Sequence, residues 1–309
     1  MSGYSYSRRE WLSMTAATVA SPKLDGFYYR DYSRCLPNYL TSLARIAYEK
    51  RNRALTLLTD APAVRERQHW ARETLWKLIG GRLERTPLNA RTVGGFEREG
   101  YRIEKVVYES RPQLFISANL YVPSAKPPFP GVLFQMGHSP IGKAYASYQK
   151  CCQALARLGY LVLAFDPMGQ GERIGYPDSS GHDTRLSSVD EEHTLPGRQM
   201  LLLGETATRY QLWDAIRSLD YLAAHPSVDP ARLASAGQSG GGTLTMLLAC
   251  ADERLAAAAV SSGNTENVAD ANFNPPGATD DAEQDLIGSG ALAFDRWDLL
   301  YPMAPKPLL

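Results

Sequence analysis

A Gly-x-Ser-x-Gly pentapeptide at residues 237–241 constrains the fold of this chain more than any other feature. It directly follows a short apolar segment, 232–236, that is typical of a strand, and it precedes a run of small residues up to 251 that is typical of a helix. A strand–turn–helix of this kind holds the serine in strained backbone, where a side chain on either neighbour would collide with strand or helix. The following helix also directs its N-terminal dipole at the serine, which favours developing negative charge. We therefore predict that Ser239 is a catalytic nucleophile.

From about residue 100 onward, strand-like and helix-like segments alternate with short connections. This alternation predicts a three-layer α/β sandwich with a mostly parallel sheet and crossover helices on both faces. The expected elements are strands at 101–108, 114–123, 131–136, 160–165, 232–236 and 255–260, and helices at 144–158, 199–224 and 241–251.

The first third of the chain has a different pattern. Apolar residues recur at helical spacing between 36 and about 80, with a break at 60–62, so residues 22–95 are predicted to form a helical N-terminal extension. His69 is expected to be either a surface residue of one of these helices or a core histidine with its hydrogen bonds satisfied. Residues 1–21 resemble a twin-arginine export signal, because Arg8 and Arg9 precede a short run of small residues. The protein is therefore expected to be periplasmic or secreted, with a cytoplasmic location as the alternative.

Composition excludes several classes of protein. Lys+Arg and Asp+Glu both number 33, so the chain lacks the basic excess of a nucleic-acid binder. No apolar run approaches the roughly 20 residues needed to cross a bilayer. The cysteines form no C-x-x-C pair, so neither a disulfide framework nor a zinc site is predicted, and we expect no metal and no cofactor. Oligomeric state is left open. The four cysteines are Cys35, Cys151, Cys152 and Cys250.

Two further segments follow the ends of predicted strands. The Asp-x-x-Gly-x-Gly turn that begins at Asp166 is expected to support the neighbouring loops structurally, and Arg173 at its end is expected either to support the loop or to touch substrate. The polar stretch that follows holds His182, Asp183 and His193 without the spacing of metal ligands, so we predict a lid or a pocket wall there.

Taken together, these motifs resemble the bacterial acetyl xylan esterase-like branch of the α/β-hydrolases. The resemblance covers about residues 100–309 and places the α/β-hydrolase domain at 96–309. It implies hydrolysis of carboxylic esters, often acetyl groups on plant polysaccharides, by a Ser-His-Asp/Glu triad without a metal, and so a small-molecule or carbohydrate ester as substrate. The ordered set comprises Gly-His-x-x-x-Gly-Lys at 137–143, Gly171-Glu172-Arg173, Trp213-Asp214-x-x-Arg217-x-x-Asp220-Tyr221-Leu222, Val228-Asp229-Pro230-x-Arg232, Gly237–Thr243 and Asp252-Glu253-Arg254.

The resemblance also implies roles for individual residues. In α/β-hydrolases the oxyanion hole uses the N–H of the residue after the nucleophile, here Gly240, and one N–H from the loop after an earlier strand. Ser139 is the candidate for the second donor, because Pro140 has no N–H. His138 is expected to shape this loop rather than to act as the base, since the base of this fold follows the last strand.

One part of the pattern is missing. In this fold the triad follows the order Ser, acid, His, yet all five histidines precede Ser239. The end of the chain at 304–309 resembles the start of a late strand, so the expectation is a hydrolase domain truncated before its final strand or strands and before its catalytic histidine. Candidate acids on an alternative strand are Asp280, Asp281, Glu283 and Asp285.

Three functional hypotheses remain from the sequence. The leading one is a serine carboxylic ester hydrolase that removes acetyl groups from a carbohydrate-type ester. A peptidase of the same fold would share Ser239, although such enzymes usually carry a β-propeller domain that a helical extension does not match. The third is an inactive fragment or pseudoenzyme without its histidine. Ester turnover dependent on Ser239 would instead indicate an upstream histidine as base, His138 first.

Overall fold

The computed structural model describes residues 32–263 and 281–309, which belong to two units, Met1–Leu43 and Ala44–Leu309. In the first unit the described part is a 3₁₀ turn (Tyr32–Arg34) and the beginning of α2. The predicted export signal at 1–21 lies outside the described residues. The architecture below is that of the second unit.

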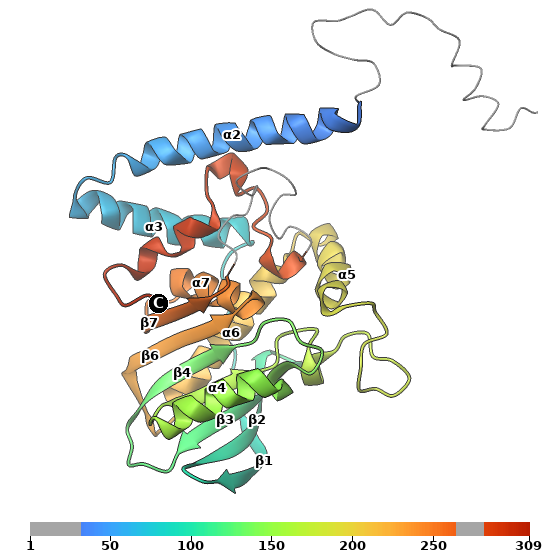
Figure 1. Cartoon of the computed structure of the whole chain (residues 1–309), viewed down its shortest axis with the longest axis vertical. Helices are drawn as coiled ribbons and strands as arrows, with labels where there is room; N and C mark the ends of the chain where they lie inside the picture. Colours follow the sequence, from blue (N-terminus) through green and yellow to red (C-terminus); the bar gives the residue numbers. More distant parts are fainter. Residues whose placement is uncertain (1–31, 264–280) are drawn as a thin grey trace, which may run out of the picture. The chain divides into compact units, whose positions relative to one another are not determined.

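Seven strands of the described chain form one mixed sheet in the order β1-β2-β3-β5-β4-β6-β7 (Figure 1). β1, β2, β3 and β5 pair antiparallel in turn, whereas β5, β4, β6 and β7 run parallel. This confirms the predicted α/β architecture, with the parallel part of the sheet carrying the crossover helices. The strands are β1 (Arg91–Arg98), β2 (Tyr101–Arg111), β3 (Leu114–Pro123), β4 (Phe129–Gln135), β5 (Leu161–Phe165), β6 (Val228–Gln238) and β7 (Leu255–Ser261).

Helices cover both faces of this sheet, with α4 on one face and α6 and α7 on the other (Figure 1). The helices are α2 (Cys35–Leu55), α3 (Ala61–Leu78), α4 (Ala146–Arg157), α5 (Val189–Leu202), α6 (Ala207–Ala224) and α7 (Gly240–Ala251). Short 3₁₀ turns lie at Gly142–Ala144, Gly171–Arg173, Ala282–Gln284 (η4), Gly290–Leu292, Arg296–Leu299 (η6) and Tyr301–Met303.

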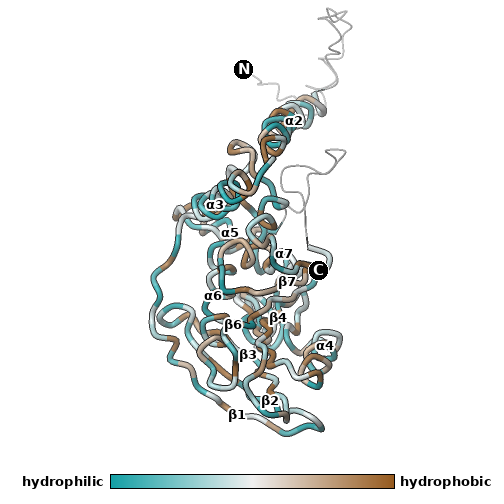
Figure 2. Tube along the Cα trace, turned by 90° about the vertical axis from the view of Figure 1, so that its left-hand side faces the viewer, coloured by the Kyte–Doolittle hydropathy of each residue, from teal (hydrophilic) through white to brown (hydrophobic). Residues whose placement is uncertain are grey.

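The two layers of the core follow from the alternation of side chains along the strands. Leu161 and Leu163 of β5 pack into the layer that contains α3, α6 and α7, while Val162 and Ala164 point to the opposite layer, where they meet Tyr148 of α4. Hydrophobic stretches accordingly run through the central strands in Figure 2. Burial on both faces explains why these strands are apolar almost throughout.

Three sequence expectations need correction or comment. The helix predicted at 199–224 is two helices, α5 and α6, because the chain turns at Gly204, which has a φ of 75°. β1 was not predicted and begins inside the segment expected to be helical, 22–95. The boundary between extension and hydrolase domain near residue 95 stays a prediction, although α3 contributes Leu75 to the same core as the sheet.

The last residues continue the sheet in the expected way. Leu308 forms a parallel bridge with Ala258 of β7, and the Leu309 N–H donates to the Ala258 carbonyl at 3.0 Å. The prediction that this segment begins a strand is confirmed for these residues. Among the described residues, no helix is both long enough and apolar enough to span a membrane.

Candidate active site

Ser239 lies at the sharp turn between β6 and α7, as the sequence predicts. Its backbone has a φ of 58° and a ψ of −123°, a conformation that side chains other than glycine rarely adopt. Two hydrogen bonds hold it there: the Ser239 N–H donates to the Ser261 carbonyl at 2.9 Å, and the Thr243 N–H donates to the Ser239 carbonyl at 3.0 Å. The turn is thus fixed by both the next strand and the first turn of α7.

Glycines on either side of Ser239 permit this close packing. A Cβ on Gly237 would lie 2.1 Å from the carbonyl oxygen of Gly241, and one on Gly241 would lie 2.1 Å from the carbonyl oxygen of Gln135. Both distances are far inside van der Waals contact, so any other residue would force the strands and α7 apart. The predicted steric reason for the motif is present in the structure.

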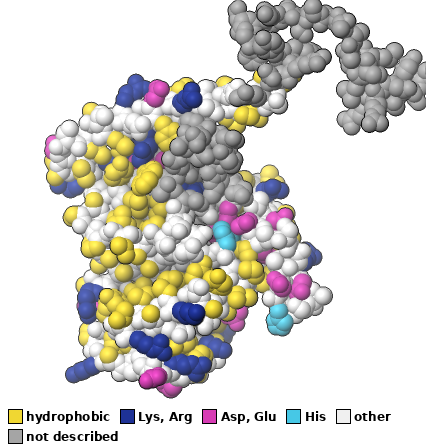
Figure 3. All heavy atoms as spheres, in the orientation of Figure 1, with side chains coloured by type: hydrophobic (Ala, Val, Ile, Leu, Met, Phe, Trp, Pro, Cys, Tyr) yellow, Lys and Arg dark blue, Asp and Glu magenta, His cyan; other side chains and the backbone are white. Residues whose placement is uncertain are grey.

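A cluster of two histidines and two carboxylates lies beside the turn. His138 comes from the loop after β4, His193 from α5, and Asp281 and Glu283 from the segment at η4. A Cβ on Gly240 would lie 2.7 Å from Glu283 Oε1 and 3.3 Å from His138 Cε1, which places the cluster against the first residue of α7. Figure 3 shows a histidine against acidic side chains on this face, next to α5.

The contacts within the cluster are short. His138 Nε2 lies 2.7 Å from Asp281 Oδ2 and 3.1 Å from Glu283 Oε1. His193 Nδ1 lies 3.2 Å from Asp281 Oδ1 and 3.6 Å from Glu283 Oε2. His193, Asp281 and Glu283 are buried, and His138 is partly exposed. These four side chains are the described residues whose donor set could hold a metal ion.

Electrostatics in the cluster favours protonated imidazoles when nothing else is bound. Burial lowers the pKa of His138, but hydrogen bonds and charge interactions with Asp281 and Glu283 outweigh it and raise the pKa to about 11. The pKa of His193 is likewise raised by the two carboxylates against the effect of burial. A protonated imidazole cannot accept the Ser239 proton. Within residues 32–263 and 281–309, no histidine hydrogen-bonds to the Ser239 hydroxyl.

The two predicted oxyanion donors differ in their surroundings. The Gly240 N–H, at the start of α7, donates to no group in the described chain, whereas the Ser139 N–H donates to Gln170 Oε1 at 2.7 Å. Ser139 would therefore have to release Gln170 before it could bind an oxyanion. The adjacent His138 N–H has no such partner among the described residues.

The Asp166 turn has the structural role that the sequence predicts. Its carboxylate accepts hydrogen bonds from the backbone N–H of Lys143 at 2.7 Å and of Glu172 at 3.0 Å, and pairs with the Lys143 ammonium. The Arg173 side chain is only 7% exposed, pairs with Asp214 at 2.8 Å, and donates to the Asp166 carbonyl at 3.0 Å. Of its two expected roles, these contacts fit loop support.

The prediction of a polar loop up to residue 196 is wrong from residue 189 onward. The segment from 189 onward is a helix, α5, and His193 on it is buried in the cluster. A sequence signal for this helix exists, since Ser188 and Glu191 have the spacing of a capping box, and the Glu191 N–H donates to the Ser188 hydroxyl at 3.3 Å. His182, in contrast, lies exposed in the preceding loop, and His69 is exposed on α3, which is one of its two expected placements.

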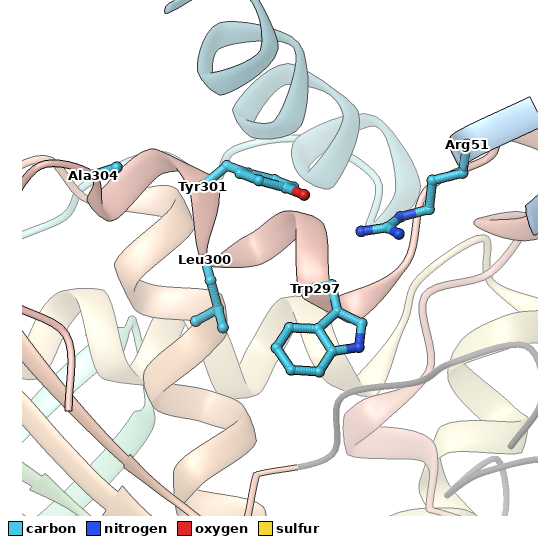
Figure 4. Close-up of a pocket in the computed structure, with 5 residues that line it drawn as sticks. All are labelled: Arg51, Trp297, Leu300, Tyr301 and Ala304. Carbon is cyan, nitrogen blue, oxygen red and sulfur yellow. The ribbon is translucent and has the colours of Figure 1, made fainter. Parts of the chain in front are cut away.

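A separate groove of about 460 Å³ lies on another part of this unit. None of its lining residues belongs to the cluster or to the Ser239 turn (Figure 4). Its lining residues do not include a paired nucleophile and base, and we assign the groove no role. Its lining residues are Arg51, Trp297, Leu300, Tyr301 and Ala304.

Comparison with known proteins agrees with this fold. "Putative hydrolase YtaP" of Bacillus subtilis (strain 168) is 27% identical over 199 residues, which cover 60% of each chain. Among solved structures, a putative acetyl xylan esterase (BF1801) from Bacteroides fragilis NCTC 9343 is 19% identical, with a TM-score of 0.68 over 93% of this chain and 76% of that one. Methylesterase BT1017 is 23% identical, with a TM-score of 0.62 over 85% of this chain and 54% of that one.

The chain thus spans 60% of the length of the curated relative and 54% of the length of the methylesterase. The structural matches show the fold. Family assignment comes from the sequence, in which residues 88–262, more than half of the chain, match the family Acetyl xylan esterase (AXE1). This protein therefore belongs to the acetyl xylan esterase family of the α/β-hydrolase fold.

Proposed function

We propose that this protein is a serine carboxylic ester hydrolase that removes acetyl groups from a carbohydrate-type ester through an acyl-enzyme on Ser239. The observation that carries the proposal is the backbone of Ser239, held at a φ of 58° between β6 and α7 by glycines that no other residue could replace. Strain of this kind persists only where the surrounding structure enforces it, and it is typical of catalytic turns. Membership of the acetyl xylan esterase family supports the ester and the acetyl group.

The chemistry follows from this placement. The Ser239 Oγ attacks the ester carbonyl, a base takes the hydroxyl proton, and the alcohol leaves with a proton while the acyl group stays on Oγ. The Gly240 N–H stabilises the oxyanion, and Ser139, once released from Gln170, or the neighbouring His138 N–H supplies a second hydrogen bond. Water then hydrolyses the acyl-enzyme.

Attack by Ser239 needs a base, and no described histidine hydrogen-bonds to its hydroxyl. The histidine cluster beside Gly240 faces Asp281 and Glu283 rather than the Ser239 hydroxyl. The two carboxylates offset the charge of the two imidazoles, so we assign the cluster no part in removing the Ser239 proton.

Hydrolysis of p-nitrophenyl acetate and of acetylated xylo-oligosaccharides, with Ser239→Ala as control, tests the proposal. Any turnover above the solution rate should disappear in S239A, and a fluorophosphonate should label the wild type at one site and leave the variant unlabelled. Turnover that S239A retains would contradict the nucleophile. Cleavage of peptide anilides in preference to the acetyl esters would instead indicate a peptidase of the same fold.

We further propose that residues 1–21 direct export through a twin-arginine-type signal. The support is the sequence alone, Arg8-Arg9 followed by small residues up to Ala20. Replacing both arginines by lysine should retain the protein in the cytoplasm of its host, and fractionation of cells carrying either form measures this.

A further inference from the structure

The strongest unassigned feature is the convergence of His138, His193, Asp281 and Glu283 on one point beside Gly240. One ligand-type atom from each of the four lies within 4.8 Å of all the others. They come from three separate segments, so no local turn explains their meeting. Two imidazole nitrogens and two carboxylate oxygens are a donor set typical of zinc and similar divalent cations.

Distances within the cluster are close to those between ligands of a shared ion. Bonds of about 2.1 Å at angles near 90–110° place two ligand atoms about 3.0–3.4 Å apart. The four nitrogen–oxygen separations are 2.7, 3.1, 3.2 and 3.6 Å, and each carboxylate turns one oxygen to His138 and the other to His193. His138 Nε2 and Asp281 Oδ2 are buried and only 2.7 Å apart, yet neither makes an aligned hydrogen bond. A buried donor or acceptor without a hydrogen bond calls for an explanation, and a shared cation supplies one here.

The outer nitrogen of each imidazole is also partnered as in a metal site. His193 Nε2 lies 2.8 Å from the Met168 carbonyl, which can only accept, so Nε2 carries the proton. A neutral His193 would then present the lone pair of Nδ1 to Asp281 and Glu283, a repulsive arrangement unless Nδ1 is protonated as well or a cation lies between them. His138 Nδ1 faces the Asp190 carboxylate at 3.5 Å. Such outer-shell partners fix the orientation of ligating histidines.

The carboxylates are supported in the same manner. Gln211 Nε2 donates to Glu283 Oε2 at 3.1 Å, and the Glu283 N–H donates to Asp281 Oδ1 at 3.1 Å. These contacts orient both acids toward the histidines. Without a cation, two buried negative charges face two neutral rings, and only added protons or a metal ion can balance them.

We propose that His138, His193, Asp281 and Glu283 bind one divalent transition-metal cation of the zinc type, next to the Gly240 amide. The expectation of no metal rested on spacing within one stretch of sequence, which cannot reveal ligands that the fold assembles from distant segments. The site goes beyond the proposed ester hydrolysis and does not depend on it, because binding is measurable without substrate.

Binding of Co²⁺ and Zn²⁺ to the full chain, after treatment with a chelator and dialysis, tests the site. We expect one ion per chain, a visible Co²⁺ spectrum of a site with nitrogen and oxygen ligands, and displacement of Co²⁺ by Zn²⁺. Glu283→Gln and His138→Gln should each weaken binding at least about tenfold. His69→Gln, on the exposed face of α3, is the matched control and should bind like the wild type.

Ser239→Ala separates the two proposals, since it removes the nucleophile and should leave metal binding unchanged. Far-UV circular dichroism checks that the variants fold. A wild-type chain that binds less than one ion, or that binds equally well in H138Q and E283Q, would overturn the metal site whatever the esterase assay gives.

Discussion

At the scale of single residues, Ser239, the proposed nucleophile, carries backbone strain. A residue other than glycine at a φ of 58° and a ψ of −123° carries strain of the order of 1–3 kcal/mol. The hydrogen bonds to Ser261 and from Thr243 prevent the backbone from relaxing. The serine is retained at a position where glycine would be the more stable residue.

This strain leads to a prediction that distinguishes the effect of the backbone conformation on stability from the effect of the serine hydroxyl. Ser239→Gly should raise the free energy of unfolding by about 1 kcal/mol, since relief of strain exceeds the greater entropy that glycine gives the unfolded chain. Ser239→Ala keeps the Cβ and should change stability little. Urea denaturation of the three proteins measures this difference, and equal stabilities for the glycine and alanine variants would argue against strain at this turn.

His225, at the end of α6, makes stability depend on pH. Burial lowers its pKa below the ordinary value of 6.5, and the Ser227 N–H donates to its Nδ1, which requires an unprotonated nitrogen there. As the pH falls through about 6.5, the unfolded chain takes up a proton that the folded protein resists. The contribution of His225 to stability is therefore lost toward acid.

Replacement of His225 by Asn should flatten the stability profile between pH 7 and pH 5. Denaturation at several pH values shows the effect, with the exposed His182→Asn as control. If both variants keep the wild-type slope, titration of His225 does not contribute.

At the scale of elements, the sequence predicted the parallel half of the sheet well. β4 and β5 are short runs that are buried almost throughout, and this pattern is typical of central parallel strands. β1 was missed because it is an exposed edge strand with two glycines and no alternation. The break between α5 and α6 was missed because apolar residues continue through Leu202 and Leu203 up to Gly204.

The candidate site was predictable only where its signal is local. Ser239 and Gly240 follow from five consecutive residues. The meeting of His193 with Asp281 depends on how α5 packs against η4, 88 positions later in the chain. Sequence spacing does not predict such a long-range contact. His138 was therefore predicted to shape a loop, and the acids were predicted only as candidates within one region of the chain.

Asp298 ties the second half of α2 and α3 to η6. Fully buried, it accepts a hydrogen bond from Arg51 Nε at 2.7 Å, pairs with Arg67, and accepts from the Asp295 N–H at 2.9 Å. Asp298→Asn would leave two largely buried arginines without their counter-charge. We expect a loss of about 3–5 kcal/mol of stability.

Chemical denaturation of Asp298→Asn measures this loss, and Glu73→Gln is the control, because Glu73 pairs with Arg82 where both are exposed. Similar small effects for both variants would show that the buried pair contributes no more than a surface pair.

At the scale of the whole molecule, the segments that form the candidate site lie at one edge of the sheet. Residues 136–143 follow β4, 166–173 follow β5, and Ser239 follows β6, so all three leave the carboxyl ends of neighbouring parallel strands. Ligand sites of open α/β sheets lie at this edge. α5 and η4 close over it and bring the remaining groups of the cluster.

An ion bound there would link segments from 138 to 283 and so stabilise the whole fold rather than one loop. Binding to the folded state alone adds about 2.7 kcal/mol when free metal is 100-fold above its Kd. For domains of 150–250 residues each kcal/mol corresponds to roughly 2–4 °C in Tm, so Zn²⁺ should raise the Tm by several degrees. Scanning calorimetry with and without a chelator measures the shift, which Glu283→Gln should abolish and Ser239→Ala should keep. A Tm that rises equally in E283Q would place the stabilising ion elsewhere on the protein, because that variant removes one of the four groups while leaving the rest of the fold intact.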